Sequence, residues 1–309
     1  MTPVHISAGD IASVATWPLV VEALRKGHRA PPADIGDTLI GTDENRMLVR
    51  SAWVPGVAAG VKAATVVPAN PARGLPSVHA QVLLFDPETG QLRVSVEGGA
   101  ITAWKTAGDS ALGCDRLACE DASTLAMIGA GAMAEPLVRA HASVRGISRV
   151  AIWNRTRARA EALARRLDGF EARVADTIED AVREADIVSC ATMTVDPVLK
   201  GTWLKPGVHL DLVGAYRADM REVDDEALRR ARIFVDSFDT TLDHIGELRD
   251  PLARGVIERE DVLGDLHALV AGEVGRENDN EITLFKNGGG AHLDVMVADA
   301  IVRALHGDG

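Results

Sequence analysis

Two glycines spaced for nucleotide binding stand in the stretch MIGAGAMA, where Gly129, Gly131 and Ala134 form a Gly-x-Gly-x-x-Ala pattern. Glycines in such a turn permit a tight bend and let the backbone approach a pyrophosphate, whose charge then rests on a helix N-terminus. The apolar run TLAMIG precedes the pattern, and RVAIWN follows the helical stretch after it, which is the context this motif requires. The sequence therefore predicts a dinucleotide site, and its predicted contacts in this turn are Gly129, Ala130, Gly131, Ala132 and Met133.

The end of the second apolar run offers a cation where an NAD site usually has a carboxylate. Trp153 is followed by Asn154, Arg155 and Thr156, an amide, a guanidinium and a hydroxyl that together suit the 2′-phosphate of NADP. Arg157 and Arg159 add positive potential, although these arginines could instead form a solvated helix face. NADP(H) is the predicted preferred cofactor, with NAD(H) possible.

Two further apolar runs end in residues that could contact the nicotinamide. Thr192 and Met193 follow DIVSCAT, and Gly214 and Ala215 follow HLDLV. In an open parallel sheet, ligands bind beyond the carboxyl ends of the strands. We therefore expect these four residues to line the nicotinamide end of the cofactor site.

Strands and helices alternate from about residue 124 to residue 237, the pattern of a parallel α/β sheet. The first 115 residues differ, because strand-like runs such as MLVRSAWV and VHAQVLLFD are separated by turn signals such as DPETGQ. The predicted fold is α/β, a Rossmann-type doubly wound parallel sheet plus a mainly antiparallel α+β domain. The predicted domains are 1–115 with 288–309, including a helix over LDVMVADAIVRALHG, and 116–287.

Composition excludes several classes of function. The 309 residues carry a formal net charge of -12 without a basic stripe interleaved with aromatics, so nucleic acid is not an expected partner. The first residues lack a basic head before an apolar run, and no window approaches ~20 apolar residues, so we expect a cytoplasmic protein without a membrane partner. Three cysteines without a C-x-x-C pair and nine histidines without H-E-x-x-H spacing predict no disulfide and no metal site.

A set of ordered motifs accompanies the glycine turn: GVKAATVVPANPARGLPSVHAQVLLFDPETGQL, ITAWKTAGDSALG, LVGAYRADMREVDD and ITLFKNGGG. With these motifs the chain resembles the ornithine cyclodeaminase/mu-crystallin family from about residue 20 to residue 300. The resemblance implies a homodimer whose interface is formed by the first domain, completed by the last helix. It also implies NAD(P)-dependent chemistry on small α-amino or α-imino acids.

The resemblance assigns roles to three residues of the first domain. Lys62 in GVK matches the family's active-site lysine, which lies by the reacting carbon and could donate a proton or stabilise developing charge. Lys105 in TAWKTA matches a position that is often arginine, so it keeps the charge but lacks the bidentate fork. Ser77 in GLPSVHA matches a position that approaches the cofactor or the substrate.

One arginine of the family is missing from this chain. The corresponding run, PPADIGDTL, contains only Asp34 and Asp37 as charged residues. Arg50 in MLVRSAW could supply the cation that a carboxylate substrate needs, or it could be a surface residue of a strand.

The loop LVGAYRADMREVDD bears on the reaction. Tyr216 stands where the resemblance to true cyclodeaminases places the aspartate that helps to expel ammonia, and a phenol is a poorer general base than a carboxylate at neutral pH. The predicted function is therefore NAD(P)H-dependent reduction of a small cyclic imino acid, with Δ1-pyrroline-2-carboxylate going to L-proline as the leading reaction. Ornithine cyclodeamination, amino acid dehydrogenation and a non-enzymatic NADPH-binding role remain alternatives. The run REVDDEALRRARI that ends this loop is interpreted as a solvated helix face.

Overall fold

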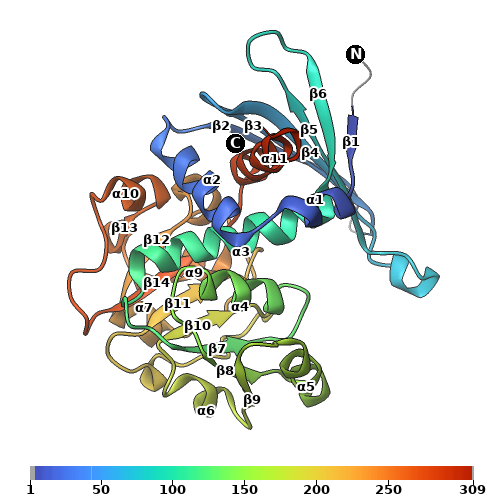
Figure 1. Cartoon of the computed structure of the whole chain (residues 1–309). Coiled ribbons are helices and arrows are strands. Elements are labelled where there is room, and N and C mark those ends of the chain that lie inside the picture. The colour runs from blue at the N-terminus through green and yellow to red at the C-terminus, as the bar shows by residue number, and fades with distance from the viewer. Residues whose placement is uncertain (1–3, 43, 308–309) are drawn as a thin grey trace. The chain divides into compact units, whose positions relative to one another are not determined.

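The computed structural model of the chain describes residues 4–42 and 44–307 and contains two compact units, 1–106 with 290–309 and 107–289 (Figure 1). Residues 1–3, where the stretch considered for a targeting signal begins, lie outside the described residues. The boundary falls inside helix α3 (Gly98–Leu117), whereas the sequence placed it after residue 115. The reason is that the second half of α3 packs in unit 2, where a Cβ on Gly113 would lie 2.7 Å from the Phe285 ring.

Unit 1 is built on a six-stranded sheet in the order β1-β6-β5-β4-β3-β2. Its strands are β1 (Val4–Ile6), β2 (Asp34–Gly41), β3 (Arg46–Val54), β4 (Ala58–Val66), β5 (Val78–Phe85) and β6 (Leu92–Glu97). Strands β2 to β6 form an antiparallel meander, and β1 joins β6 in parallel. The other elements wholly in this unit are α1 (Ala8–Val14), α2 (Trp17–Arg29), the short η1 (Asn70–Arg73) and α11 (Ala291–His306).

The last helix of the chain packs on the sheet of unit 1. Figure 1 shows α11 lying across it, and α11 contacts β3 and β4. Along β4 the side chains alternate, so Gly60, Lys62 and Ala64 are buried on the same face of the sheet. Position 60 requires glycine, because a Cβ there would lie 2.6 Å from Val295 Cγ2 of α11. The helix α11 therefore covers the face on which Lys62 lies.

Unit 2 is built on an eight-stranded sheet in the order β13-β12-β14-β11-β10-β7-β8-β9, in which all neighbours are parallel. Its strands are β7 (Thr124–Ile128), β8 (Arg149–Trp153), β9 (Glu171–Val174), β10 (Ile187–Cys190), β11 (His209–Leu212), β12 (Ala231–Val235), β13 (Val262–Gly264) and β14 (Ile282–Lys286). The direction of winding reverses between β7 and β10. The chain thus contains a doubly wound parallel sheet in unit 2 and a mainly antiparallel sheet in unit 1, which confirms the predicted fold class.

Helices cover both faces of the parallel sheet, with α4 and α6 on opposite sides (Figure 1). They are α4 (Ala134–Ala142), α5 (Arg157–Arg166), α6 (Ile178–Val182), α7 (Asp225–Arg230), α8 (Phe238–Thr241), α9 (Gly246–Ala253) and α10 (Leu266–Ala271), with the short turns η2 (Gly201–Trp203) and η3 (Arg259–Asp261). Because both faces are covered, every residue of β10, β11 and β14 is buried. No helix in residues 4–42 and 44–307 is long and apolar enough to cross a membrane.

Candidate active site

Lys62 is a buried cation held by side chains from two helices of unit 1. It is 9% exposed, and its Nζ donates to Asp294 Oδ1 at 2.9 Å and to Thr102 Oγ1 at 2.5 Å. Asp294 lies in the first turn of α11, and Thr102 lies in α3, where its hydroxyl donates to the carbonyl of Gly98. The contacts from β4, α3 and α11 therefore fix the direction of the ammonium group.

Arg50 lies beside Lys62 on the same face of the sheet. The two residues are directly opposite each other in the register of β3 and β4, and Asp37 of β2 is opposite Arg50. Arg50 donates to Asp37 Oδ2 through Nε at 2.8 Å and also lies within 2.7 Å of it through Nη2. The structure thus brings Arg50 to Lys62, and one edge of the Arg50 guanidinium is held by Asp37 of β2.

Lys105 and Ser77 occupy different places in unit 1. Lys105 is buried on α3, three residues after Thr102, so it projects from the same side of that helix. Ser77 precedes β5, in which Val82 is the residue paired with Lys62. At ~3.4 Å per residue, Ser77 is about 17 Å along the strand from that pair, so the structure does not bring it to Lys62.

The glycine turn of unit 2 is tightly packed at Gly129 and open at Gly131. Gly129 adopts a φ of 104°, and a Cβ on it would lie 2.7 Å from the carbonyl oxygen of Ala191. At Gly131 a Cβ would meet no described atom within 4 Å, so a side chain there would fill the open space over the turn. Helix α4 begins at Ala134, directly after the turn. The turn therefore leaves room for a phosphate group at a helix N-terminus. The other predicted residues of the turn are half-buried or exposed: Ala130, Ala132 and Met133.

Asn154 holds the glycine turn rather than standing free. Its Oδ1 accepts from the N–H of Ala130 at 3.0 Å, and its Nδ2 donates to the carbonyl of Thr156 at 2.9 Å. The sequence assigned this amide to a ribose phosphate. The structure corrects that interpretation in part, because only one N–H of the amide is left for a ligand.

Three side chains after β8 remain available to an anion. Arg155, Thr156 and Arg159 are exposed, and the two arginines make no ion pair or side-chain hydrogen bond with the part of the chain that the structure describes. Arg157 differs, since it pairs with Glu161 at 3.2 Å and Asp176 at 2.7 Å. The positive charge available to a ligand at this strand end therefore belongs to Arg155 and Arg159.

Three of the four residues predicted for the nicotinamide end share a partner, Glu222, that could not be seen in the sequence pattern. The N–H groups of Thr192, Gly214 and Ala215 all donate to the carboxylate of Glu222, while Met193 is 74% exposed. Glu222 is fully buried.

The interpretation of REVDD as part of a solvated helix is therefore wrong. Helix α7 begins only at Asp225, with Asp224 as its N-cap, and both Arg221 and Glu222 before it are buried. The signal that could have shown this is Asp224 itself, because an aspartate at an N-cap leaves the preceding residues outside the helix.

Tyr216 is exposed at the carboxyl end of β11. Its ring lies 5.8 Å from the Arg217 guanidinium, and Arg217 is paired in two contacts, at 2.8 and 2.9 Å, with Asp219. The hydrogen bonds from Arg217 lower the pKa of Asp219. An aspartate so held is a weak proton acceptor.

Three comparisons relate the chain to known proteins. Residues 43–308 match the model of the ornithine cyclodeaminase/mu-crystallin family. The chain is 48% identical over 309 residues to the Δ1-pyrroline-2-carboxylate reductase of Paracoccus denitrificans, which covers 99% of this chain and 98% of that protein. Among solved structures, the Δ1-pyrroline-2-carboxylate reductase of Thermococcus litoralis in complex with NADH and L-proline has a TM-score of 0.92 at 31% identity over 98% of each chain. An archaeal alanine dehydrogenase dimer with bound NAD has a TM-score of 0.93 at 27% identity over 99% of this chain and 97% of that one.

Proposed function

Since this chain belongs to the ornithine cyclodeaminase/mu-crystallin family, we propose that it is an NAD(P)H-dependent reductase that converts Δ1-pyrroline-2-carboxylate to L-proline. The observation that carries the proposal is the buried ammonium of Lys62, oriented by Asp294 and Thr102 beside the cation of Arg50. The high identity to a reductase of this substrate supports it. So does Tyr216, at the position where a cyclodeaminase has an aspartate.

The reaction adds a hydride to the imine carbon and a proton to the imine nitrogen. When bound, the reduced nicotinamide supplies the hydride. Lys62 donates the proton to the nitrogen, and its contacts with Asp294 and Thr102 hold the donor in one direction. No general base is needed, because the C=N bond is already formed in the substrate.

Two other cations of unit 1 suit the substrate carboxylate. Arg50 uses two of its five N–H donors on Asp37, which leaves three for a ligand. Lys105 is buried one turn of α3 from Thr102, and its ammonium adds a positive charge without the planar fork of a guanidinium. We assign Arg50 and Lys105 to binding and orientation of the carboxylate, which holds the substrate in a reactive position.

The cofactor is assigned to unit 2, with its pyrophosphate at the glycine turn. The available cations of Arg155 and Arg159 and the hydroxyl of Thr156 favour NADPH, because a 2′-phosphate would gain charge-assisted hydrogen bonds there. The remaining N–H of Asn154 adds one donor. The similar protein from Thermococcus litoralis is in complex with NADH, so the proposed preference for NADPH rests on the residues after β8 of this chain.

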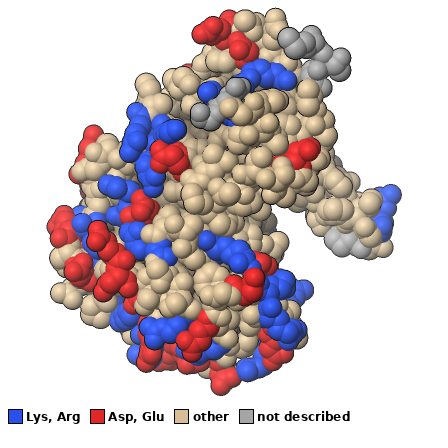
Figure 2. All heavy atoms as spheres, in the orientation of Figure 1, with Lys and Arg blue, Asp and Glu red and all other residues tan. Residues whose placement is uncertain are grey.

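A homodimer through the sheet of unit 1 is also part of this proposal. Five large apolar side chains on its strands are at least half exposed: Val4 58%, Leu39 58%, Ile40 56%, Trp53 50% and Val78 52%. In the view of Figure 2, charged side chains gather over unit 2, while much of the visible surface of unit 1 carries neither sign. Exposed apolar surface of this kind marks an interface, and the similar alanine dehydrogenase is a dimer. Light scattering should give twice the mass of the chain, and Trp53→Lys should lower it.

The test of the proposed function is the loss of NADPH absorbance on addition of Δ1-pyrroline-2-carboxylate, with L-proline identified as the product. We expect one proline for each NADPH oxidised. A folded protein that binds NADPH but does not oxidise it with this substrate would contradict the proposal.

A further inference from the structure

Glu222 joins the ends of two neighbouring parallel strands in unit 2. Its Oε1 accepts from Thr192, from the backbone N–H at 2.7 Å and from the hydroxyl at 2.8 Å. Its Oε2 accepts from the N–H groups of Gly214 at 2.7 Å and Ala215 at 3.2 Å. Thr192 follows β10 and Gly214 follows β11, so one carboxylate ties together the carboxyl ends of both strands. All four partners are donors, so the ionised, acceptor-only form of Glu222 satisfies them together.

The backbone around this carboxylate is packed without spare room. A Cβ on Gly214 would lie 1.8 Å from the carbonyl oxygen of Thr192 and 2.6 Å from Glu222 Oε1. The glycine turn adjoins the same strand end, since a Cβ on Gly129 would lie 2.7 Å from the carbonyl oxygen of Ala191. A shift of the loop after β10 would therefore disturb the loop after β11, and the reverse also holds. Glu222 is the side chain that holds both of these loops.

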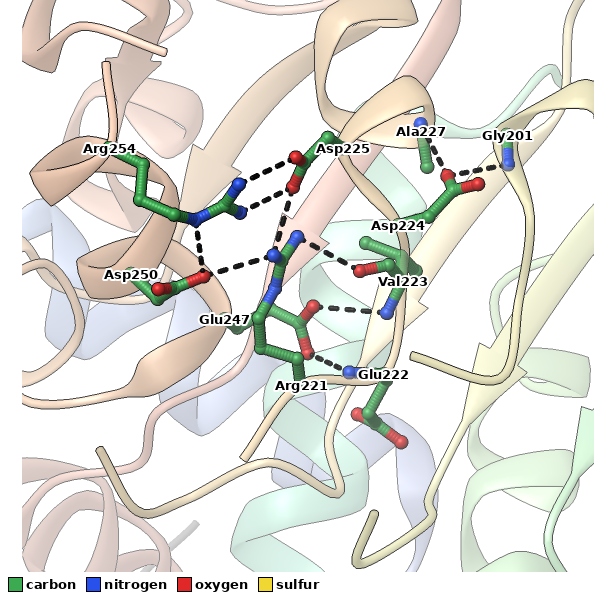
Figure 3. A network of polar contacts seen from close by, with 10 residues as sticks. All are labelled: Gly201, Arg221, Glu222, Val223, Asp224, Asp225, Ala227, Glu247, Asp250 and Arg254. Carbon is green, nitrogen blue, oxygen red and sulfur yellow. Dashed lines mark hydrogen bonds and ion pairs between the residues drawn. The ribbon is translucent and has the colours of Figure 1, made fainter. Parts of the chain in front are cut away.

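A second buried carboxylate holds the backbone that carries Glu222. Glu247, in α9, accepts from the N–H of Glu222 at 2.8 Å and from the N–H of Val223 at 3.1 Å. Figure 3 shows these two contacts, with the carboxylate of Glu222 pointing away from that of Glu247. Glu247 therefore holds the backbone of Glu222, and the side chain of Glu222 in turn holds the loops after β10 and β11.

An ion-pair network anchors the same segment from the other side. Arg221, the residue before Glu222, lies 2.9 Å from Asp225 and 3.0 Å from Asp250. Arg254 donates to both oxygens of Asp225 and to Asp250 (Figure 3). Four charges in one network with a bidentate contact hold their geometry better than an isolated surface pair. Glu222 thus lies in a segment whose backbone is fixed on both sides.

Lys286 balances the charge of this buried group. Its Nζ donates to the carbonyl oxygens of Leu212, at the end of β11, and Asn287, each at 2.8 Å. Burial raises the pKa of Glu222, and the charge of Lys286 opposes that shift. The same strand end therefore carries a buried cation beside the buried carboxylate.

We propose that Glu222 is a positioning residue, which holds the loops after β10 and β11 in the geometry that hydride transfer from the nicotinamide requires, and that Glu247 supports it. This inference rests on the proposed function. Ligands of an open parallel sheet bind beyond the carboxyl ends of its strands, and the residues that Glu222 holds lie at two of these ends. Displacement of a reactive group by about 1 Å can cost about 100-fold in rate. The residues proposed to bind the phosphates, at the glycine turn and after β8, make no hydrogen bond with Glu222 in the part of the chain that the structure describes.

The test is Glu222→Gln, which keeps the size of the side chain but replaces one acceptor oxygen by an NH2 group that faces backbone N–H groups. We expect kcat for imine reduction to fall about 100-fold, while the Kd for NADPH changes less than tenfold. With NADPH deuterated at the transferred position, the primary isotope effect on kcat should rise, because the hydride step becomes limiting. Glu247→Gln should show the same pattern with a smaller loss, and it replaces Glu222→Gln if that variant does not fold.

The matched control is Glu226→Gln, which changes an acid of α7 four residues away and should leave kcat unchanged. A folded Glu222→Gln that keeps kcat within twofold would overturn the proposal, and so would an equal loss of NADPH affinity and kcat. The fluorescence emission of bound NADPH tests this inference independently of the proposed function, because the measurement needs no substrate. If the natural protein does not reduce the imine, an emission changed by Glu222→Gln at nearly unchanged Kd still supports positioning, and an unchanged emission overturns it.

Discussion

The ammonium of Lys62 and the carboxylate of Asp294 lie 2.9 Å apart in the interior of unit 1, although 232 positions separate them in the chain. Asp294 is 1% exposed, and its second oxygen, Oδ2, has no hydrogen-bond partner among the residues that the structure describes. Its charge therefore depends on Lys62. This pair joins the last helix of the chain to the strand that carries the proposed proton donor.

The ion pair of Lys62 and Asp294 should contribute measurably to the free energy of unfolding. Lys62→Met leaves the carboxylate of Asp294 buried without its cation, which should lower the free energy of unfolding by about 3–5 kcal/mol. Adding Asp294→Asn removes that charge, and the double variant should recover much of the loss. Urea unfolding of the two single variants and the double variant measures the coupling. If the losses of the single variants simply add, the two groups do not depend on each other.

Activity should not recover with stability. We expect Lys62→Met to lower kcat by orders of magnitude while NADPH still binds, because the proton donor is lost and the dinucleotide residues are unchanged. The double variant with Asp294→Asn should be equally inactive. Steady-state assays with Lys26→Met, an exposed lysine of α2, as the control check this. Retention of most of the turnover in Lys62→Met would remove Lys62 from the mechanism.

Cofactor choice should depend on one arginine. NADPH should bind at least several-fold more tightly than NADH, and Arg155→Ala should reduce that ratio by about tenfold, the loss of one charge-assisted contact. Arg157→Ala is the matched control, because its guanidinium is already paired with Asp176 and Glu161. Fluorescence titration gives both affinities. Equal affinities in the natural protein would show that these cations serve another purpose.

Ornithine should be a poor substrate. Tyr216 supplies no carboxylate for removal of a proton from the amine, and Asp219 is held by Arg217. With L-ornithine and NAD or NADP, we expect little ammonia under conditions in which the imine is reduced rapidly. Release of ammonia and proline together, at a rate comparable to imine reduction, would mean that another acid, such as the buried Asp109, acts as the base.

Stability should fall with rising pH because of Glu247. Burial, with the charge of Glu222 adding to it, raises the pKa of Glu247 to about 7 from the ordinary 4.5. The folded protein therefore favours the protonated form, and this contribution is present below pH 4.5 and lost as the pH rises to 7. Relative to Glu247→Gln, the free energy of unfolding of the natural protein should fall by about 3 kcal/mol across that window. If the free energies of unfolding of the natural protein and of Glu247→Gln change with pH in the same way between pH 5 and 8, the prediction is wrong.

The dinucleotide turn, the parallel sheet and the family could be predicted from the sequence, because each depends on residues near one another in the chain. The glycine spacing and the apolar runs around it act within one strand–turn–helix unit. The boundary between the units was less accessible, because α3 continues through it and its division depends on what each half packs against.

Residue types alone did not determine which polar groups remain for a ligand. Asn154, Arg155 and Arg157 are neighbours in the chain, yet the first holds the glycine turn, the second is unpaired among the described residues, and the third is paired. Each outcome depends on which partner the fold places within about 3 Å.

The burial and the hydrogen-bond partners of Glu222 and Asp294 were determined by the tertiary structure alone. In the sequence, Glu222 lies in a run of alternating charges typical of a solvated helix, and Asp294 lies in an apolar helix far from Lys62. The fold puts Glu222 where donors from two strand ends converge, and it puts Asp294 over the buried face of β4. A buried charge is stable only where other groups pair with it, and here these groups come from distant segments of the chain. The residues near Glu222 and Asp294 in the sequence therefore could not predict those partners.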